Sequence, residues 1–167
     1  SINGFTTKEY TCYHARTLAE HAPVAVEVLA DLVRNPLLRS EDVEIERDVI
    51  LQEIFDAEET PEDFVHDYFL EQYWPGHPLG WPVLGTKDTI AGLSRDVLSG
   101  FLGERYRPDR VIVAAAGDLE HDAFVDLCRR HFEGLQGAGT APVIDRPDFS
   151  PGVFLSQRDL EQVHLVV

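Results

Sequence analysis

Two glutamates, Glu46 and Glu53, lie seven residues apart in the stretch EDVEIERDVILQEIFDAEET, residues 41–60. On an α-helix seven residues make two turns less about 20°, so both carboxylates share a face, roughly 10 Å apart along the axis. Ile50 lies between them on that face. A carboxylate turned toward a packed side costs several kcal/mol unless it is paired, hydrogen-bonded or bound to a cation. The spacing alone favours two outward glutamates paired with Arg47 or with basic residues of neighbouring helices, because glutamate is a good helix former. It also suits a metal-binding pair.

The composition limits what the chain can do. Its 167 residues are 44% apolar and 26% charged, and no apolar run approaches the roughly 20 residues that span a bilayer, which predicts a globular chain without a membrane segment. A net charge of −16 excludes nucleic acid and anionic membrane surfaces as partners and suits basic peptides, although it also fits a role in solubility alone. Cys12 and Cys128 form no CxxC pair, which favours a reducing compartment.

The elements that must position the two glutamates follow from local patterns. Residues 2–18 are rich in Thr, Tyr and Phe and predict two strands joined near residues 7–9. From Pro23 the apolar residues recur at helical spacing as far as the NP dipeptide at 35–36, and a second helix is expected from Ser40 to about Glu58. Further helices are expected at residues 61–73, 88–107 and 120–135, with a loop rich in Pro and Gly at 74–86.

Two apolar runs outside these helices predict buried strands. They are RVIVAAAGDL, residues 110–119, and EQVHLVV, residues 161–167, the last strand. Helices clustered between groups of strands favour an α+β fold, a two-layer sheet with helices packed on one face. We expect residues 1–167 to form a single, truncated domain that continues beyond its last strand, because a buried strand is an unfavourable place for a chain to end.

Several blocks of the sequence, in this order, closely resemble the pitrilysin or insulinase family of zinc peptidases. The match is best to the bacterial and mitochondrial processing-peptidase branch and covers essentially the whole chain. The resemblance implies an α+β half-molecule, and a homologous second half or subunit that closes a proteolytic chamber around peptides or presequences. The blocks are INGFTTKEYTCYHARTLAEHAPVAVEVLADLVRNPLL, ERDVILQEI, TPEDFVHDYFLEQYWPGHPLGWPVLGT, FLGERYRPDRVIVAAAGDL and RDLEQVHLVV.

The resemblance also assigns residues to a site. In the family, zinc is held by the two histidines of an HxxEH motif and by a distant glutamate, while the glutamate of the motif activates water. The block ERDVILQEI then makes Glu53 the third zinc ligand and Glu46 an accessory carboxylate. In relatives, the strand that corresponds to INGFTT takes the substrate as an extra strand, which implies that Asn3, Gly4 and Phe5 bind substrate. Without the resemblance, INGFTT is an ordinary edge strand with a packed phenylalanine.

One departure from the family pattern limits this reading. No HxxEH motif occurs in the 167 residues, and TLAEH at 17–21 has Thr17 in place of the first histidine. The resemblance puts the motif before Ser1, so we expect no catalytic residue in this chain and no activity from it alone, since zinc needs three protein ligands. Two alternatives stay open: a non-catalytic family member acting as an assembly or substrate-binding subunit, and an unrelated acidic interaction module. The resemblance implies the bacterial cytoplasm, with the mitochondrial matrix as the alternative.

Overall fold

The computed structural model describes residues 1–136 and 143–167 and divides them into two compact units. The first unit contains residues 1–40 and 94–136, and the second contains residues 41–93 and 143–167. Each unit is therefore built from two separate stretches of the chain. The expectation of one domain over residues 1–167 stays a prediction, and each unit is described below by itself.

A β-hairpin opens the first unit, as the sequence predicts. Strand β1 (Ile2–Thr6) pairs antiparallel with β2 (Thr11–Ala15). The turn between them is closed by the Thr7 N–H, which donates to the carbonyl of Tyr10 at 2.8 Å, and the Thr7 hydroxyl accepts from the N–H of Tyr10 at 3.1 Å. A threonine that holds its own turn in this way explains why the hairpin forms without glycine at the turn.

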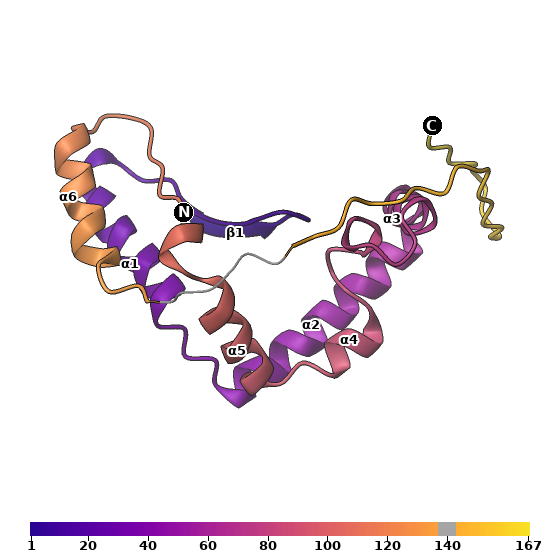
Figure 1. Cartoon of the computed structure of the whole chain (residues 1–167), viewed down its shortest axis with the longest axis horizontal. Coiled ribbons are helices and arrows are strands. Elements are labelled where there is room, and N and C mark those ends of the chain that lie inside the picture. Colours follow the sequence, from indigo (N-terminus) through magenta and orange to yellow (C-terminus); the bar gives the residue numbers. More distant parts are fainter. Residues whose placement is uncertain (137–142) are drawn as a thin grey trace. The chain divides into compact units, whose positions relative to one another are not determined.

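The core of the first unit lies between two helices that are distant in sequence. Helix α1 (Ala22–Arg34) packs against α6 (His121–Phe132), and the two lie side by side in Figure 1. Val26 and Ala30 on α1 and Leu127 on α6 are buried. Arg34, at the last position of α1, donates to the main-chain carbonyl of His131, so a cation meets an unpaired carbonyl near the end of α6. The other elements of this unit are η1 (Ala19–His21), α5 (Arg95–Arg105) and η3 (Pro108–Arg110).

The second unit is built on the long helix α2 (Ser40–Glu59). Helix α4 (Lys87–Ala91) lies beside it, joined to it by hydrogen bonds and an ion pair (Figure 1). Ile54 of α2 and Ile90 of α4 are the buried apolar residues of this unit within the part of the chain that the structure describes. The remaining elements are α3 (Pro61–Tyr73) and η2 (Pro78–Gly80).

Residues 143–167 follow the aromatic side of α3 without forming a helix or strand. The N–H of Ser150 donates to the carbonyl of Tyr73 at 2.8 Å, and the ring of Phe149 stacks on that of Tyr73 with centroids 5.6 Å apart. Further along, the guanidinium of Arg158 lies 3.7 Å from the ring centroid of Phe64. Aromatic rings spaced along α3 thus hold this segment by stacking and by a cation–π contact.

Three predicted elements differ from the structure. The helix expected at residues 88–107 is two helices, α4 and α5, because Gly92 weakens the helix and Ser94 starts a new one by accepting from the N–H of Val97 at 3.3 Å. The strands expected at 110–119 and 161–167 are extended coil, with Ile112 and Val163 93% and 97% exposed.

An apolar run becomes a strand only where a partner completes its hydrogen-bond ladder. Within the described residues only β1 and β2 pair, so neither run finds that partner. The α+β class is confirmed by the mixture of helices with a two-stranded sheet. Among these same residues, no helix has both the length and the apolar composition needed to cross a bilayer.

Candidate functional site

Glu46 and Glu53 both lie on α2, as the sequence predicts, and both are exposed. The two carboxylates are therefore not turned toward a packed side of the helix. Ile54 is the buried residue of α2, and at 100° per residue the side chain of Glu53 leaves the helix about 100° away from it. Glu46 leaves the helix only about 20° from Glu53. The two carboxylates therefore form one acidic row beside the packed stripe, where water already solvates them.

The packed stripe of α2 contains a cation that the sequence analysis treated only as a partner for carboxylates. Around Ile54, the less exposed positions of the helix recur every three or four residues, the spacing of one helix face. They are Asp42, Val43, Arg47, Ile50, Leu51, Ala57 and Glu58. A charged residue at a core-facing position is unusual unless its charge is paired. This position was the available signal that Arg47 has a structural partner.

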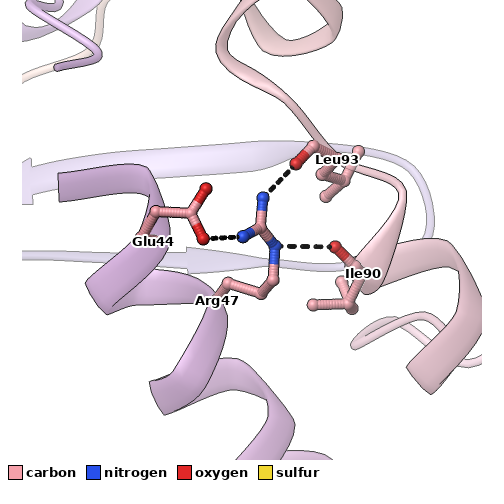
Figure 2. A network of polar contacts seen from close by, with 4 residues as sticks. All are labelled: Glu44, Arg47, Ile90 and Leu93. Atoms are coloured by element: carbon pink, nitrogen blue, oxygen red, sulfur yellow. Dashed lines mark hydrogen bonds and ion pairs between the residues drawn. The ribbon is translucent and has the colours of Figure 1, made fainter. Parts of the chain in front are cut away.

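Arg47 holds the end of α4, as Figure 2 shows. Its Nε donates to the carbonyl of Ile90 at 3.3 Å and its Nη2 donates to the carbonyl of Leu93 at 2.5 Å, while its Nη1 pairs with the carboxylate of Glu44. The side chain of Arg47 is 18% exposed and that of Glu44 is 67% exposed. The carbonyl of Ile90 also accepts from the main-chain N–H of Leu93 at 3.1 Å. The guanidinium is therefore a second donor to Ile90 and a side-chain donor to the carbonyl of Leu93.

A second contact joins the two helices at the other end of α4. The Nζ of Lys87 lies 2.5 Å from a carboxylate oxygen of Glu58, and both side chains are about half exposed. Arg158 also donates to the main-chain carbonyl of Glu58. Glu58 is therefore not a freely solvated end residue of the helix. Glu59, the exposed last residue of α2, is a better matched control for the acidic row.

The strand that carries Asn3, Gly4 and Phe5 has one open edge among the described residues, because β1 pairs with β2 alone. Hydrogen-bonded and non-hydrogen-bonded pairs alternate along an antiparallel ladder. The N–H of Thr7 bonds to Tyr10, so the pair of Gly4 with Tyr13, three positions back, is non-hydrogen-bonded. The N–H and C=O of Gly4 thus point away from β2, toward the open edge.

Two neighbours shape the surroundings of Gly4. The Oδ1 of Asn3 accepts from the N–H of Gly4 at 2.8 Å, so a side chain occupies the donor on the open edge. On the face of the sheet, a Cβ added to Gly4 would lie 3.3 Å from the Tyr13 ring and 3.3 Å from the Cys12 carbonyl, closer than such atoms usually approach. Glycine at this position lets the Tyr13 ring lie directly over the strand.

The hairpin is joined to α5 through a pair of tyrosines. The hydroxyls of Tyr13 and Tyr106 lie 3.1 Å apart. Burial, followed by the hydrogen bond with Tyr13, holds the pKa of Tyr106 well above its ordinary value. The hydroxyl of Tyr106 therefore stays protonated and can keep this bond throughout the physiological pH range. On β1, the ring centroid of Phe5 lies 5.9 Å from that of Tyr10 and 6.1 Å from that of His14.

A hollow on the first unit contains none of the predicted site residues. It is an open groove of about 860 Å³ between the coil at 113–115 and α6, lined mainly by apolar side chains such as Leu119 and Phe124. Cys128 also lines it, and burial raises the pKa of its thiol. A raised pKa reduces the reactive thiolate, so this cysteine has the character of an inert packed residue.

The described residues do not complete a metal site. Among residues 1–136 and 143–167 no group of three His, Cys, Asp or Glu side chains is arranged to hold an ion. Glu53 offers one carboxylate, whereas zinc in proteins takes three or four protein ligands. This chain by itself therefore fits the role of supplying one ligand and does not fit that of binding zinc alone.

Comparison with protein families decides where the chain belongs. The family described as Insulinase (Peptidase family M16) matches residues 1–87, and the domain described as Peptidase M16 inactive domain matches residues 92–167. The chain is a member of the M16 insulinase family. The resemblance to the pitrilysin or insulinase family is thus confirmed. The gap between the two matches, residues 88–91, lies within α4.

Curated M16 relatives match nearly the whole chain. A protein of Mycobacterium tuberculosis named as an uncharacterized zinc protease is 41% identical over 98% of this chain and 39% of its own length. One of the same description from Bacillus subtilis is 35% identical over 98% of this chain and 40% of its own length. Subunit 1 of the bovine mitochondrial cytochrome b-c1 complex is 38% identical over 90% of this chain and 31% of its own length. The chain spans about two fifths of the length of the zinc-protease relatives.

Solved structures show the same fold. A protease from Helicobacter pylori superimposes with a TM-score of 0.78 at 23% identity, covering 88% of this chain and 36% of its own. The first half of the periplasmic protease PqqL from Escherichia coli gives a TM-score of 0.71 at 17% identity, covering 86% of this chain and 32% of its own. These likenesses show that the chain has the fold seen in these two protease structures.

Proposed function

We propose that this M16 chain is part of a zinc-dependent metalloendopeptidase that cleaves peptides or presequences, in which Glu53 supplies a zinc ligand and Glu46 an accessory carboxylate. The observation that carries the proposal is the exposed acidic row of α2 in a chain that belongs to a peptidase family. Relatives named as zinc proteases support the choice of metal. When bound, zinc would activate a water molecule for attack on the peptide bond.

The residues of this chain then have two tasks. Glu53 offers an exposed carboxylate to the metal, and Glu46 lies on the same side of α2, where an outer carboxylate orients ligands and tunes their basicity. The 167 residues contain no HxxEH motif. We therefore assign this chain no catalytic base, and we assign the remaining ligands to other parts of the intact protein.

The open edge of β1 is the proposed substrate site. A peptide that adds to it as an extra strand would form main-chain hydrogen bonds with the N–H and C=O of Gly4. Main-chain bonds of this kind depend little on the peptide's sequence, so many sequences could bind. The backbone of Phe5 faces β2 in this register, so Phe5 would contact the peptide through its ring. Asn3 would contact it through its side chain only after that side chain has released the N–H of Gly4. The net charge of −16 favours basic peptides by long-range attraction.

The proposal includes a partner and a compartment. A homologous second half or subunit would close the chamber, as suggested by the match to the structure titled as the first half of PqqL. Relatives from Mycobacterium and Bacillus favour the bacterial cytoplasm, and the mitochondrial bovine relative keeps the mitochondrial matrix as an alternative.

One of the relatives supports a second candidate function, that of a non-catalytic subunit. The bovine relative, 38% identical, is named as a subunit of the cytochrome b-c1 complex and not as a protease. This chain would then be a non-catalytic subunit for assembly or substrate binding, and the acidic row would be a solvated surface. The two candidates differ in whether the intact protein needs the carboxylate of Glu53.

The test replaces carboxylates by amides of the same size in the intact protein. We expect Glu53→Gln to remove most of the zinc and most of the turnover of a basic model peptide. Glu46→Gln should keep more zinc and still lower the rate, by about 10- to 100-fold. Glu59→Gln, on the same helix, should behave as wild type. Zinc per chain and turnover are measured together.

Full zinc and full turnover in the Glu53→Gln variant would reject Glu53 as the ligand. An intact wild-type protein that holds no zinc and cleaves no peptide would instead support the non-catalytic subunit.

A further inference from the structure

The stretch of α2 that carries Glu53 is held from both ends by one short segment, residues 87–93. Arg47 bonds to the carbonyls of Ile90 and Leu93, and eleven residues later Glu58 pairs with Lys87. Eleven residues of helix rise about 16 Å, and Glu53 lies between the two contacts. A helix fixed at two points cannot easily rotate or slide between them.

The two contacts are not equivalent. The ion pair of Lys87 with Glu58 is about half exposed on both sides, and exposed pairs of this kind stabilise little because water and salt screen them. The guanidinium of Arg47 is largely buried and donates to two main-chain carbonyls. Its removal takes the side-chain donor from the carbonyl of Leu93, while the carbonyl of Ile90 still accepts from the N–H of Leu93. Loss of a largely buried, charged donor costs more than the loss of a surface pair.

The shape of the guanidinium suits it to fix an orientation. Its planar fork presents donors in fixed directions, so the bonds to Ile90 and Leu93 set both the distance and the rotation of α2 relative to the end of α4. The exposed carboxylate of Glu44, one turn earlier, holds the same group from the other side (Figure 2). A lysine at this position would keep the charge, but a single ammonium reaches two carbonyls in this geometry poorly.

We infer that Arg47 is a positioning residue for Glu53: it fixes the section of α2 from which that carboxylate reaches the metal. The inference rests on the proposed function only in what Glu53 binds, because the contacts of Arg47 are made within the second unit whatever the activity. Displacing a ligand-bearing helix weakens the metal site as loss of an outer-shell partner does, by about 10- to 100-fold.

The test compares Arg47→Met and Arg47→Lys with wild type in the intact protein. Arg129→Met is the matched control, because Arg129 also pairs with a carboxylate three residues earlier, Asp126, but is 72% exposed on α6. Zinc affinity is measured by competition with a chelator, kcat and KM with a basic peptide, and amide hydrogen exchange over residues 50–58. Arg47→Met should weaken zinc binding and lower kcat by about 10- to 100-fold, leave KM nearly unchanged, and speed exchange over 50–58. Arg129→Met should match wild type in all four measurements.

Arg47→Lys separates positioning from charge. We expect it to recover only part of the loss, and full recovery would overturn the inference in favour of a charge effect. Wild-type zinc affinity and kcat in Arg47→Met would overturn it as well. If Arg47→Met does not fold, Arg47→Lys alone decides: the inference stands if zinc affinity and kcat fall and fails if both stay at wild-type values.

If wild type neither binds zinc nor cleaves peptide, the proposed function fails. Hydrogen exchange over residues 50–58 then still decides whether Arg47 fixes this section of α2, and unchanged exchange in Arg47→Met would reject it.

Discussion

The hydrogen bond between Asn3 and Gly4 predicts that removal of the asparagine side chain strengthens peptide binding. The Oδ1 of Asn3 accepts from the N–H of Gly4 at 2.8 Å, and this N–H is the donor that an added strand would use. A peptide must displace the side chain first. A typical hydrogen bond contributes about 1 kcal/mol net, and 1.4 kcal/mol is a factor of ten in affinity. We therefore expect Asn3→Ala to lower the Kd for an extended peptide by about fivefold.

The assay is calorimetric titration of the intact protein with an extended basic peptide that resists cleavage. Asn35→Ala is the control, since Asn35 donates to Asp31 at the end of α1 and lies outside the hairpin. A peptide methylated on alternate amide nitrogens should bind more weakly to wild type and to Asn3→Ala alike, because it cannot donate to the carbonyl of Gly4. An unchanged or weaker Kd for Asn3→Ala would refute the competition between the side chain and the peptide.

Three further predictions concern stability, metal and thiol chemistry. In the intact protein, Ile54→Ala should lower the free energy of unfolding by about 2–5 kcal/mol, because Ile54 is 5% exposed. Ile45→Ala should change it by less than about 0.5 kcal/mol, because Ile45 is 64% exposed. Urea denaturation measures both changes, and similar values would contradict the assigned packed face of α2. The 167-residue chain alone should bind zinc weakly and hydrolyse no peptide, because no group of three metal-ligating side chains occurs among its described residues. Tight, stoichiometric zinc binding in calorimetry would show that the site is misassigned. Cys128 should react with iodoacetamide at pH 8 more slowly than a small free thiol, since burial raises its pKa and lowers its thiolate fraction; mass spectrometry follows the modification, and an equal rate would contradict the buried position.

Local patterns predict most of the elements of this chain, because their causes lie within a few residues. The hairpin of β1 and β2 follows from residues 2–18, and α1, α2, α3 and α6 follow from apolar periodicity. The strands predicted at 110–119 and 161–167 do not form, because the cause of a strand is not local in the sequence. A strand requires a partner, and no local pattern shows whether one is present.

The candidate site is likewise predictable only where its cause is local in the sequence. Periodicity alone places Glu46 and Glu53 on one side of α2. Their exposure depends on which face of the helix packs, and the packed face is set by α4 and by the core around Ile54. Arg47 was treated as a partner for Glu46 and Glu53 because the sequence shows these nearby carboxylates but not the contacts of Arg47 with the carbonyls of Ile90 and Leu93.

The order in which the two units are interleaved affects how the chain is made. Val26 on α1 is buried in the same helix pair as Leu127 on α6, about a hundred residues later in the chain. A ribosome adds about 5–20 residues per second, so the apolar side of α1 waits on the order of 5–20 seconds for its partner to be synthesised. During that interval Val26 and Ala30 are uncovered, which is the state in which nascent chains aggregate or recruit chaperones. Ile54 and Ile90 of the second unit are only 36 residues apart in the numbering, and that pair of helices can form while α6 is still untranslated.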